Sequence, residues 1–342
     1  MFKKNKLVWI LPFLVIATIL LFNSPIFSGQ VAAQSRIADP LPSWNQGSTK
    51  QAIISYVQQV TDPANDSYIL PADRIATFDN DGTLWIEKPL YVQLVFVLDR
   101  LKALAPQHPE WQEAQPFKSI LSNDLNQLQS LKIPDDLFKL ILATHSGMSE
   151  EEFEAQVTRF LQNQTHPRFK RRYTKLIYQP MVELVNYLKL NDFQVYICSG
   201  GGIDFIRTFS DSAYGIPTEK VIGSAVQKEF MLADDKSSTF MRLPEIVKPI
   251  NDKAGKPVNI DRYIGKKPVM AVGNSDGDIQ MLQYADSNAL PDFELLLHHD
   301  DSEREYDYDQ GTEKALRLAQ ENNWQVISLK RDFKQVFPFE DN

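Results

Sequence analysis

Two acidic side chains follow directly on a short apolar segment. The run Ile75–Phe78 predicts a buried strand, and Asp79 and Asp81 stand just beyond its end. Alternate residues at a strand end point the same way, so the two carboxylates should share one small space, where repulsion favours a bound cation or a shared proton. Gly82 permits a sharp turn and Thr83 adds a hydroxyl group. The spacing suggests metal or acid–base chemistry, although a calcium-type loop or an ordinary turn would use the same residue types.

A second predicted strand, Val195–Cys198, ends in a hydroxyl group and three glycines. Ser199–Gly202 lie between this strand and a predicted helix that contains Phe205 and Ile206. Backbone N–H groups in such a turn can face an anion. The segment therefore predicts an anion-binding turn, and a tight connection between strand and helix is the alternative.

A third group of polar side chains follows the predicted strand Val269–Val272. Asn274, Asp276 and Asp278 come just after it, and Lys253 and Lys256 precede it. A strand end again delivers oxygen ligands to the same edge of a sheet, and a hard divalent cation such as magnesium prefers such ligands. The pattern predicts a magnesium site near Asp79.

In order along the chain, these segments resemble the four sequence motifs of the haloacid dehalogenase (HAD) superfamily, in its phosphoserine-phosphatase-like branch. The resemblance extends over residues 72–330. It implies that Asp79 is a nucleophile that becomes an aspartyl-phosphate, and that Asp81 is a general acid and then a general base. It also implies a set of phosphate-binding residues, namely Asn80, Ser199, Gly200 and Lys256. The implied ligands of Mg²⁺ are Asp79, Asp81 through its backbone carbonyl, Asn274 and Asp278.

One residue departs from the family pattern. Asn274 stands where the family usually has an aspartate that binds the metal directly. An amide oxygen can coordinate magnesium but brings no charge, so either the affinity is lower or Asp278 binds more directly. Lys253 is an alternative to Lys256, and the extra carboxylate of Asp276 has no assigned role beyond that of a solvated loop acid.

The predicted fold is α/β, a Rossmann-like parallel sheet with a HAD core and an inserted α-helical C1 cap. Strands alternate with helices, and helical patterns predominate between the first two strands. We expect four parts: a signal peptide or N-terminal anchor, an N-terminal helix with the first part of the core, a helical cap, and the remainder of the core. Their bounds are 1–33, 34–88, 89–176 and 177–342.

Local signals predict several further elements. Ser48 and Gln51 suggest a capping box for a helix that runs to Val60, and Ser149 with Glu152 suggests another. A hairpin is expected from the segments Val221–Leu232 and Ser238–Leu243, which flank a polar turn. His298 and His299 follow a predicted strand, Phe293–Leu297, where they either border the pocket, bind a surface cation or belong to a solvated loop.

The composition limits the partners. The 342 residues carry a formal charge of −8, and without residues 1–33 the charge becomes −11 because three lysines are removed. An acidic surface argues against nucleic acid as a partner. The only cysteine, Cys198, rules out an intramolecular disulfide and is expected to be a buried strand residue.

The N-terminal residues predict export. Three lysines precede the apolar run Leu7–Phe22, and Val31–Ala33 are small residues suited to cleavage before Gln34. We expect a periplasmic or secreted protein. A membrane would be a partner only if residues 7–22 stay uncleaved as an anchor.

The reaction predicted from the sequence is magnesium-dependent hydrolysis of a small phosphate monoester. Asp81 favours phosphate ester chemistry, since the dehalogenases and phosphonatases of the superfamily lack an aspartate there. Transfer of phosphate to an alcohol remains an alternative, as does an exported binding protein on a retired enzyme scaffold. The sequence does not identify the substrate.

Overall fold

The computed structural model describes residues 39–122 and 135–340. The predicted signal peptide or anchor, residues 1–33, lies outside them. Among the described residues, no helix combines the length and the apolar character needed to cross a membrane.

The core is a parallel sheet of six strands in the order β3-β2-β1-β6-β7-β8. Each strand is short and rich in apolar residues, as expected for a sheet covered on both faces. The strands are β1 (Ile75–Phe78), β2 (Gln194–Gly202), β3 (Val221–Ser224), β6 (Met270–Gly273), β7 (Phe293–His298) and β8 (Gln325–Ser328).

Alternate residues of the strands serve two separate cores. Ala76 and Phe78 face one core, whereas Cys198, Ala271 and Leu296 face the other. Cys198 is fully buried, and burial raises the pKa of its thiol to about 11. The prediction of a buried strand residue is confirmed.

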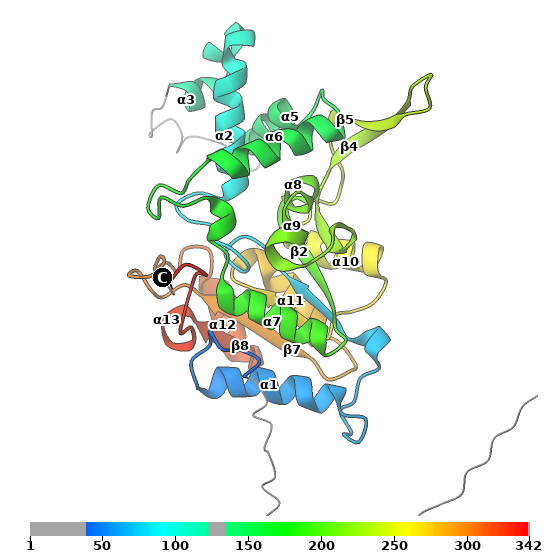
Figure 1. Ribbon diagram of the computed structural model, residues 1–342, viewed down its shortest axis with the longest axis vertical. Helices are drawn as coiled ribbons and strands as arrows, with labels where there is room; N and C mark the ends of the chain where they lie inside the picture. The colour runs from blue at the N-terminus through cyan, green and yellow to red at the C-terminus, as the bar shows by residue number, and fades with distance from the viewer. Residues whose placement is uncertain (1–38, 123–134, 341–342) are drawn as a thin grey trace, which may run out of the picture. The chain divides into compact units, whose positions relative to one another are not determined.

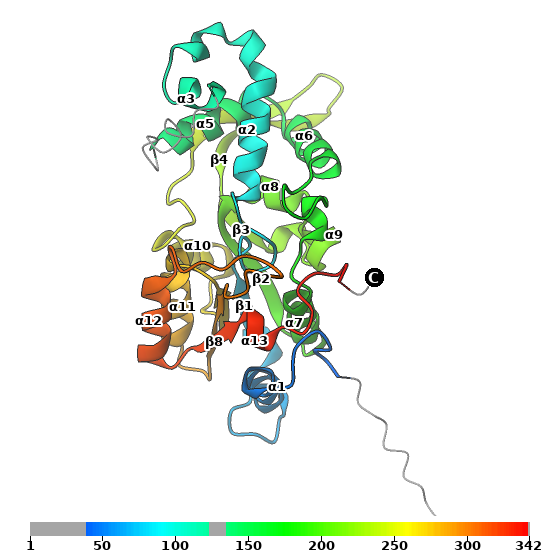
Figure 2. The ribbon, with the colours of Figure 1, turned by 90° about the vertical axis from the view of Figure 1, so that its left-hand side faces the viewer.

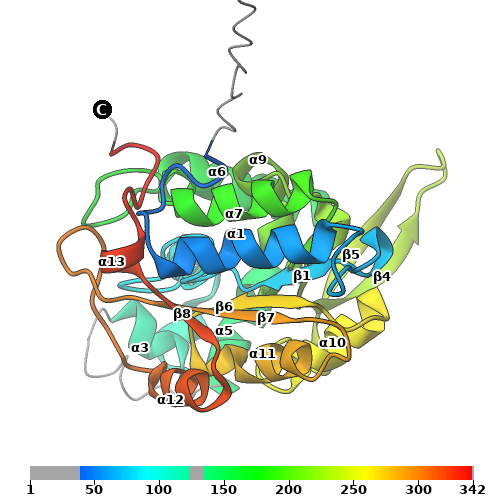
Figure 3. The ribbon, with the colours of Figure 1, turned by 90° about the horizontal axis from the view of Figure 1, so that it is seen from below.

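Helices cover both faces of the sheet, as Figures 2 and 3 show. On one face lie α1 (Ser48–Thr61) and α7 (Gln179–Leu190), which pack their apolar residues on the first core. The opposite face is covered by α10 (Gly255–Ile264), α11 (Ile279–Asp286) and α12 (Glu313–Asn322). Three short helices complete the core: α8 (Ile203–Arg207), α9 (Ser210–Tyr214) and α13 (Leu329–Asp332). The predicted α/β fold with a parallel sheet is thereby confirmed.

A helical insert separates β1 from β2 and lies at one end of the core (Figure 1). Its helices are α2 (Val92–Leu104), α3 (Phe117–Leu121), α5 (Asp135–His145) and α6 (Glu150–Asn163). The predicted capping box at α6 is confirmed: the Ser149 hydroxyl accepts from the Glu152 backbone N–H, and the Glu152 carboxylate accepts from that of Ser149.

Two predictions about local structure are wrong. Val221–Ser224 forms β3 of the main sheet, so the hairpin consists only of β4 (Val226–Leu232) and β5 (Ser238–Ile246). Gly223 lets β3 pack closely on the start of α8, since a Cβ there would lie 2.8 Å from the Ile203 backbone. Ser48 does not cap α1 either, because the N-cap position is Gly47, which lacks a side chain.

The strand order reverses between β1 and β6. The chain runs outward from β1 through β2 to β3 and then returns to place β6 on the other side of β1. In open parallel sheets, ligands bind at such a switch point, beyond the carboxyl ends of the strands. The fold therefore brings Asp79 and Asp278 to one place.

Glu294 should make stability depend on pH. It lies on β7 with 5% of its surface exposed, and its Oε1 has no hydrogen-bond partner among the described residues. Burial, reinforced by the charges of Asp292 and Asp286, raises the pKa of Glu294 from 4.5 to about 9. The folded protein keeps a proton that the unfolded chain releases, so stability should fall as the pH rises between about 4.5 and 9.

We expect Glu294→Gln to remove this dependence, because glutamine does not ionise. Urea unfolding at pH 5 and pH 8 measures the free energy of unfolding of both proteins. That of the variant, relative to the wild type, should increase as the pH rises, by at most about 1.4 kcal/mol per pH unit. Glu321→Gln is a suitable control, since the Glu321 side chain is 57% exposed. The same pH dependence in the wild type and in Glu294→Gln would contradict the assignment.

Candidate active site

Lys256 joins two carboxylates that arrive from different strands. Its Nζ atom lies 2.8 Å from Oδ1 of Asp79 and 2.5 Å from Oδ1 of Asp278. Asp79 follows β1, Asp278 follows β6, and Lys256 lies in the first turn of α10. All three side chains are buried. The geometry selects Lys256 over the alternative, Lys253, which is exposed.

The negative charge of this group exceeds what one lysine neutralises. Burial raises the pKa of Asp79, the Asp278 carboxylate raises it further, and Lys256 opposes both effects. Although burial acts against it, the same two carboxylates raise the pKa of Lys256, which stays charged. A divalent cation beside Asp79 would offset the remaining repulsion, so the donor set suits magnesium.

Asp81 has an environment that disfavours the charged form of its carboxyl group. Its Oδ1 accepts a hydrogen bond of 2.9 Å from the indole N–H of Trp85. Burial raises the pKa of Asp81 to about 6; the bond from Trp85 opposes the shift, and the charge of Glu87 adds to it. Burial raises the pKa of both acids after β1, and Asp81, unlike Asp79, has no lysine beside its carboxylate. The role of proton donor predicted for Asp81 stays a prediction.

Asn274 is packed against the turn that follows Asp81. Its Oδ1 accepts a hydrogen bond of 3.1 Å from the Thr83 hydroxyl, and its Nδ2 donates to Oε1 of Glu87 at 3.4 Å. Gly82 adopts a φ of +72°, and a Cβ there would lie 2.1 Å from Nδ2 of Asn274. The glycine thus serves both the left-handed turn and the close approach of Asn274.

Both carboxylate oxygens of Asp278 are engaged. Oδ1 accepts from Lys256, while Oδ2 accepts from the backbone N–H groups of Asn274 and Ser275 and from the Ser275 hydroxyl, at 3.0 to 3.1 Å. Its side chain closes a capping box with Ser275. Asp278 therefore positions the loop and Lys256, and Asn274 has the less occupied side-chain oxygen.

Ser199 lies where β2 bulges. The pairing of β2 with β3 shifts register between Cys198 and Gly202, which pushes the intervening residues out of the ladder. The Ser199 hydroxyl accepts a hydrogen bond of 3.1 Å from the Gly201 N–H, and Gly200 is exposed. This turn faces the same space as Asp79.

Asn80 points elsewhere. Its side chain is buried and accepts a hydrogen bond of 3.0 Å from the Tyr214 hydroxyl. The phosphate contact predicted for Asn80 would therefore have to use its backbone. The carboxylate of Asp276, whose role the sequence left open, accepts a hydrogen bond of 2.8 Å from the Ala315 N–H in the first turn of α12.

His299 contacts the turn after Asp81 without lining the cavity. The sequence did not predict this contact. Its Nε2 lies 2.8 Å from the carbonyl oxygen of Gly82, and its Nδ1 lies 3.0 Å from a carboxylate oxygen of Glu305. Both partners only accept, so the ring satisfies them as an imidazolium. Burial opposes this charge, yet the bond to Glu305 raises the pKa of His299. His298 instead meets Asp309 near the surface at 2.7 Å, in keeping with a polar loop.

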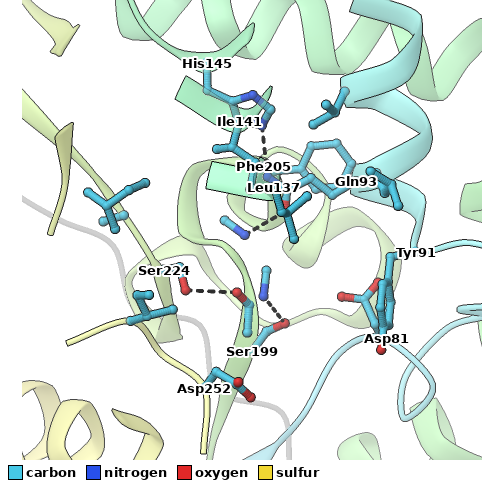
Figure 4. Close-up of a pocket in the computed structure, with 18 of the residues that line it drawn as sticks. Asp81, Tyr91, Gln93, Leu137, Ile141, His145, Ser199, Phe205, Ser224 and Asp252 are labelled. Carbon is cyan, nitrogen blue, oxygen red and sulfur yellow. Dashed lines mark hydrogen bonds between the residues drawn. The ribbon is translucent and has the colours of Figure 1, made fainter. Parts of the chain in front are cut away.

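A cavity of about 410 Å³ joins these residues to the helical insert (Figure 4). Most of the predicted site residues line its core end, namely Asp79, Asp81, Ser199, Gly200, Lys256 and Asp278. Asn80 and Asn274 are not among the residues that line it. The arrangement places the carboxyl groups of Asp79 and Asp81 and the ammonium group of Lys256 around one small space.

Comparison with known proteins identifies the core. Residues 76–283 match the family model of the haloacid dehalogenase-like hydrolases. A protein of unknown function from Anaerococcus prevotii has a similar structure, with a TM-score of 0.55 and 18% identity over 87% of this chain and 97% of that one. A phosphoserine phosphohydrolase-like protein from Francisella tularensis is 21% identical over 76% and 95% of the two chains, with a TM-score of 0.41. No curated protein sequence matches the chain.

Removing the Lys256 charge should destabilise the protein. In Lys256→Met, Asp79 and Asp278 would face each other without a cation, and breaking a buried ion pair in this way costs about 3–5 kcal/mol. Urea unfolding in the presence of a chelator measures the loss. Lys253→Met is the matched control and should change stability by less than about 0.5 kcal/mol. Equal stabilities of the two variants would show that the buried pairs contribute little.

Proposed function

Because the chain belongs to the haloacid dehalogenase-like hydrolases, we propose that it is a magnesium-dependent phosphomonoester hydrolase acting through an aspartyl-phosphate on Asp79. One observation carries this proposal. Asp79 lies in the cavity beside a charged lysine and next to Asp81, whose raised pKa suits a proton donor. A nucleophile, an acid and a cation within one cavity are what phosphoryl transfer to a carboxylate needs.

In the first step, a carboxylate oxygen of Asp79 forms a bond to phosphorus while the bond from phosphorus to the ester oxygen breaks. The departing alkoxide takes the carboxyl proton of Asp81 and leaves as an alcohol. Lys256 and the Ser199 turn offset the charge of the phosphoryl oxygens. Lys256 also holds Asp79 in place through a contact of 2.8 Å.

In the second step, Asp81 acts as a base. Its carboxylate accepts a proton from water, and the water oxygen bonds to phosphorus while the bond to Asp79 breaks. Inorganic phosphate leaves, and both aspartates return to their starting protonation states. The Trp85 indole N–H, 2.9 Å from Asp81, holds the carboxylate in one orientation throughout.

Magnesium would be held by Asp79, by the backbone carbonyl of Asp81 and by a third residue. Asn274 suits that role better than Asp278, since its Oδ1 accepts one hydrogen bond whereas the two oxygens of Asp278 together accept four. When bound, the ion would offset the repulsion between the nucleophile and the phosphate group.

The two alternatives weigh less. Transfer of phosphate to an alcohol would use the same first step, and adding an alcohol acceptor to the assay separates it from hydrolysis. A retired scaffold would need neither an aspartate paired with a buried lysine nor a second aspartate with a raised pKa, and here Asp79 and Asp81 meet these two descriptions.

Phosphate release from a panel of small phosphate monoesters tests the proposal. We expect activity with magnesium and its loss with a chelator. Asp79→Asn should abolish turnover, and Asp81→Asn should lower it by about 10²- to 10⁴-fold. Asp276→Asn is the matched control, because its carboxylate contacts α12 rather than the cavity. Full activity of Asp79→Asn would contradict the aspartyl-phosphate mechanism.

We also propose that the protein is exported, on the evidence of residues 1–33. Cell fractionation and mass spectrometry of the full-length chain should find it outside the cytoplasm with Gln34 at its N-terminus. An intact N-terminus in the membrane fraction would instead favour an anchor at residues 7–22. Retention of the full chain in the cytoplasm would contradict export.

A further inference from the structure

The cavity has two ends of different chemistry. Its core end is lined by the charged groups already described, whereas its other end reaches into the helical insert and is mainly apolar. We call this second end the insert chamber. Its apolar lining consists of Leu94, Val97, Leu137, Phe138, Ile141, Phe153, Phe205, Val226, Ile246 and Ile250.

One face of α5 lies over the chamber. Leu137, Ile141 and His145 recur at intervals of four residues, which places them on one side of the helix. In Figure 4, His145 and Ile141 lie at the top, Leu137 lies level with Phe205 and Gln93, and Ser199 lies farther down toward the core. Leu137 and Ile141 are only partly buried, so a ligand in the chamber would cover apolar surface that the described protein atoms leave accessible.

The charged groups of the chamber are already paired. The Arg242 guanidinium donates to Asp204 at 2.6 Å and to Glu150 at 2.8 Å. The central carbon of the guanidinium, Cζ, lies 3.9 Å from the centre of the Phe153 ring. Lys228 also pairs with Asp204 and Glu150, at 2.8 Å each. Asp204 and Glu150 therefore balance both positive charges, so neither cation offers an uncompensated charge to a carboxylate or a second phosphate of a substrate.

The neutral side chains of Gln93 and His145 are paired as well, whereas the Tyr91 hydroxyl, beside Asp81 at the core end (Figure 4), has no hydrogen-bond partner among the described residues. Nε2 of Gln93 lies 3.0 Å from His145, and its Oε1 accepts from the Gly202 N–H at 2.7 Å. Nδ1 of His145 lies 2.8 Å from the Thr144 hydroxyl. Burial, reinforced by the charge of Arg242, lowers the pKa of His145 to about 3, so the ring is neutral. A substrate rich in hydroxyl groups would find few unpaired partners here.

We propose that the insert chamber selects phosphate monoesters whose alcohol is apolar and uncharged, such as aryl-alkyl or alkyl alcohols, over those of polyols, sugars and amino acids. This inference rests on the proposed phosphatase function. The phosphate group would lie at the core end near Asp79, and the alcohol would extend between α2 and α5. Asp252, which also lines the cavity, would repel a second anionic group.

The test compares esters whose leaving groups have the same intrinsic reactivity. Ethyl, butyl and hexyl phosphates are all esters of primary alcohols, as are 2-phenylethyl phosphate and glycerol 1-phosphate. We expect kcat/KM of the wild-type protein to rise about three- to fourfold per added methylene group until the chamber is filled. 2-Phenylethyl phosphate should exceed glycerol 1-phosphate by about 100-fold. Equal constants, or a preference for glycerol phosphate or phosphoserine, would overturn the proposal.

Substitution of the chamber wall gives a second readout. Ile141→Asn should lower the ratio of kcat/KM for 2-phenylethyl phosphate to that for glycerol 1-phosphate about tenfold. Leu142→Asn is the matched control, since Leu142 is the next residue of α5 and does not line the cavity. An unchanged ratio in folded Ile141→Asn would contradict the assignment of the chamber.

Binding separates this inference from the proposed function. Calorimetric titration of Asp79→Asn with 2-phenylethyl phosphate and with glycerol 1-phosphate reports recognition without turnover. If no ester is hydrolysed but the aryl-alkyl ester still binds about 100-fold more tightly, the phosphatase proposal fails and the chamber assignment stands. Hydrolysis of all the esters with equal affinities leaves the phosphatase proposal intact and overturns the chamber.

Discussion

The site depends on one cation between two buried carboxylates. Lys256 contacts Asp79 and Asp278, which follow the neighbouring strands β1 and β6. Either carboxylate alone would meet a large desolvation cost at this depth, and together they would also repel. The ammonium group offsets both effects and holds the Asp79 carboxylate in place. The strand order makes this possible, because the switch point of the sheet is where β1 and β6 end side by side.

A second buried ion pair holds the turn that carries Asp81. The imidazolium of His299 donates to the Gly82 carbonyl and to Glu305, and Glu305 also accepts from the Tyr178 hydroxyl at 3.2 Å. The bond to the Gly82 carbonyl adds to those that already hold the turn, from the Thr83 hydroxyl to Asn274 and from the Gly82 N–H to the Trp85 carbonyl. The charge of His299 thus supports the position of Asp81 without lining the cavity, and it is balanced within its own pair.

The residues that follow the strands could be predicted from the sequence, whereas the distant residues that hold them in place could not. Asp79, Ser199 and Asn274 each follow an apolar run, and period and turn chemistry are local signals. His299 lies 217 positions from Gly82, so no local sequence pattern predicts their contact. The prediction that Val221–Ser224 belongs to the hairpin fails for the same reason. Its pairing with β2 depends on the tertiary fold and leaves no local signal. Asp276 likewise acquires its role from α12.

The neutral side chain of Asn274 is compatible with the neighbouring carboxylate of Glu87. The Asn274 amide donates to Glu87 and accepts from Thr83, so it satisfies a buried carboxylate and a hydroxyl at once. An aspartate at position 274 could accept from Thr83 but would face Glu87 as a second negative charge. Glu87 also accepts from the Tyr308 hydroxyl at 2.7 Å, which fixes it in place. The neutral Asn274 therefore accompanies the Glu87 carboxylate, which the segment after β1 contributes, so the negative charge at this edge of the sheet is relocated rather than lost.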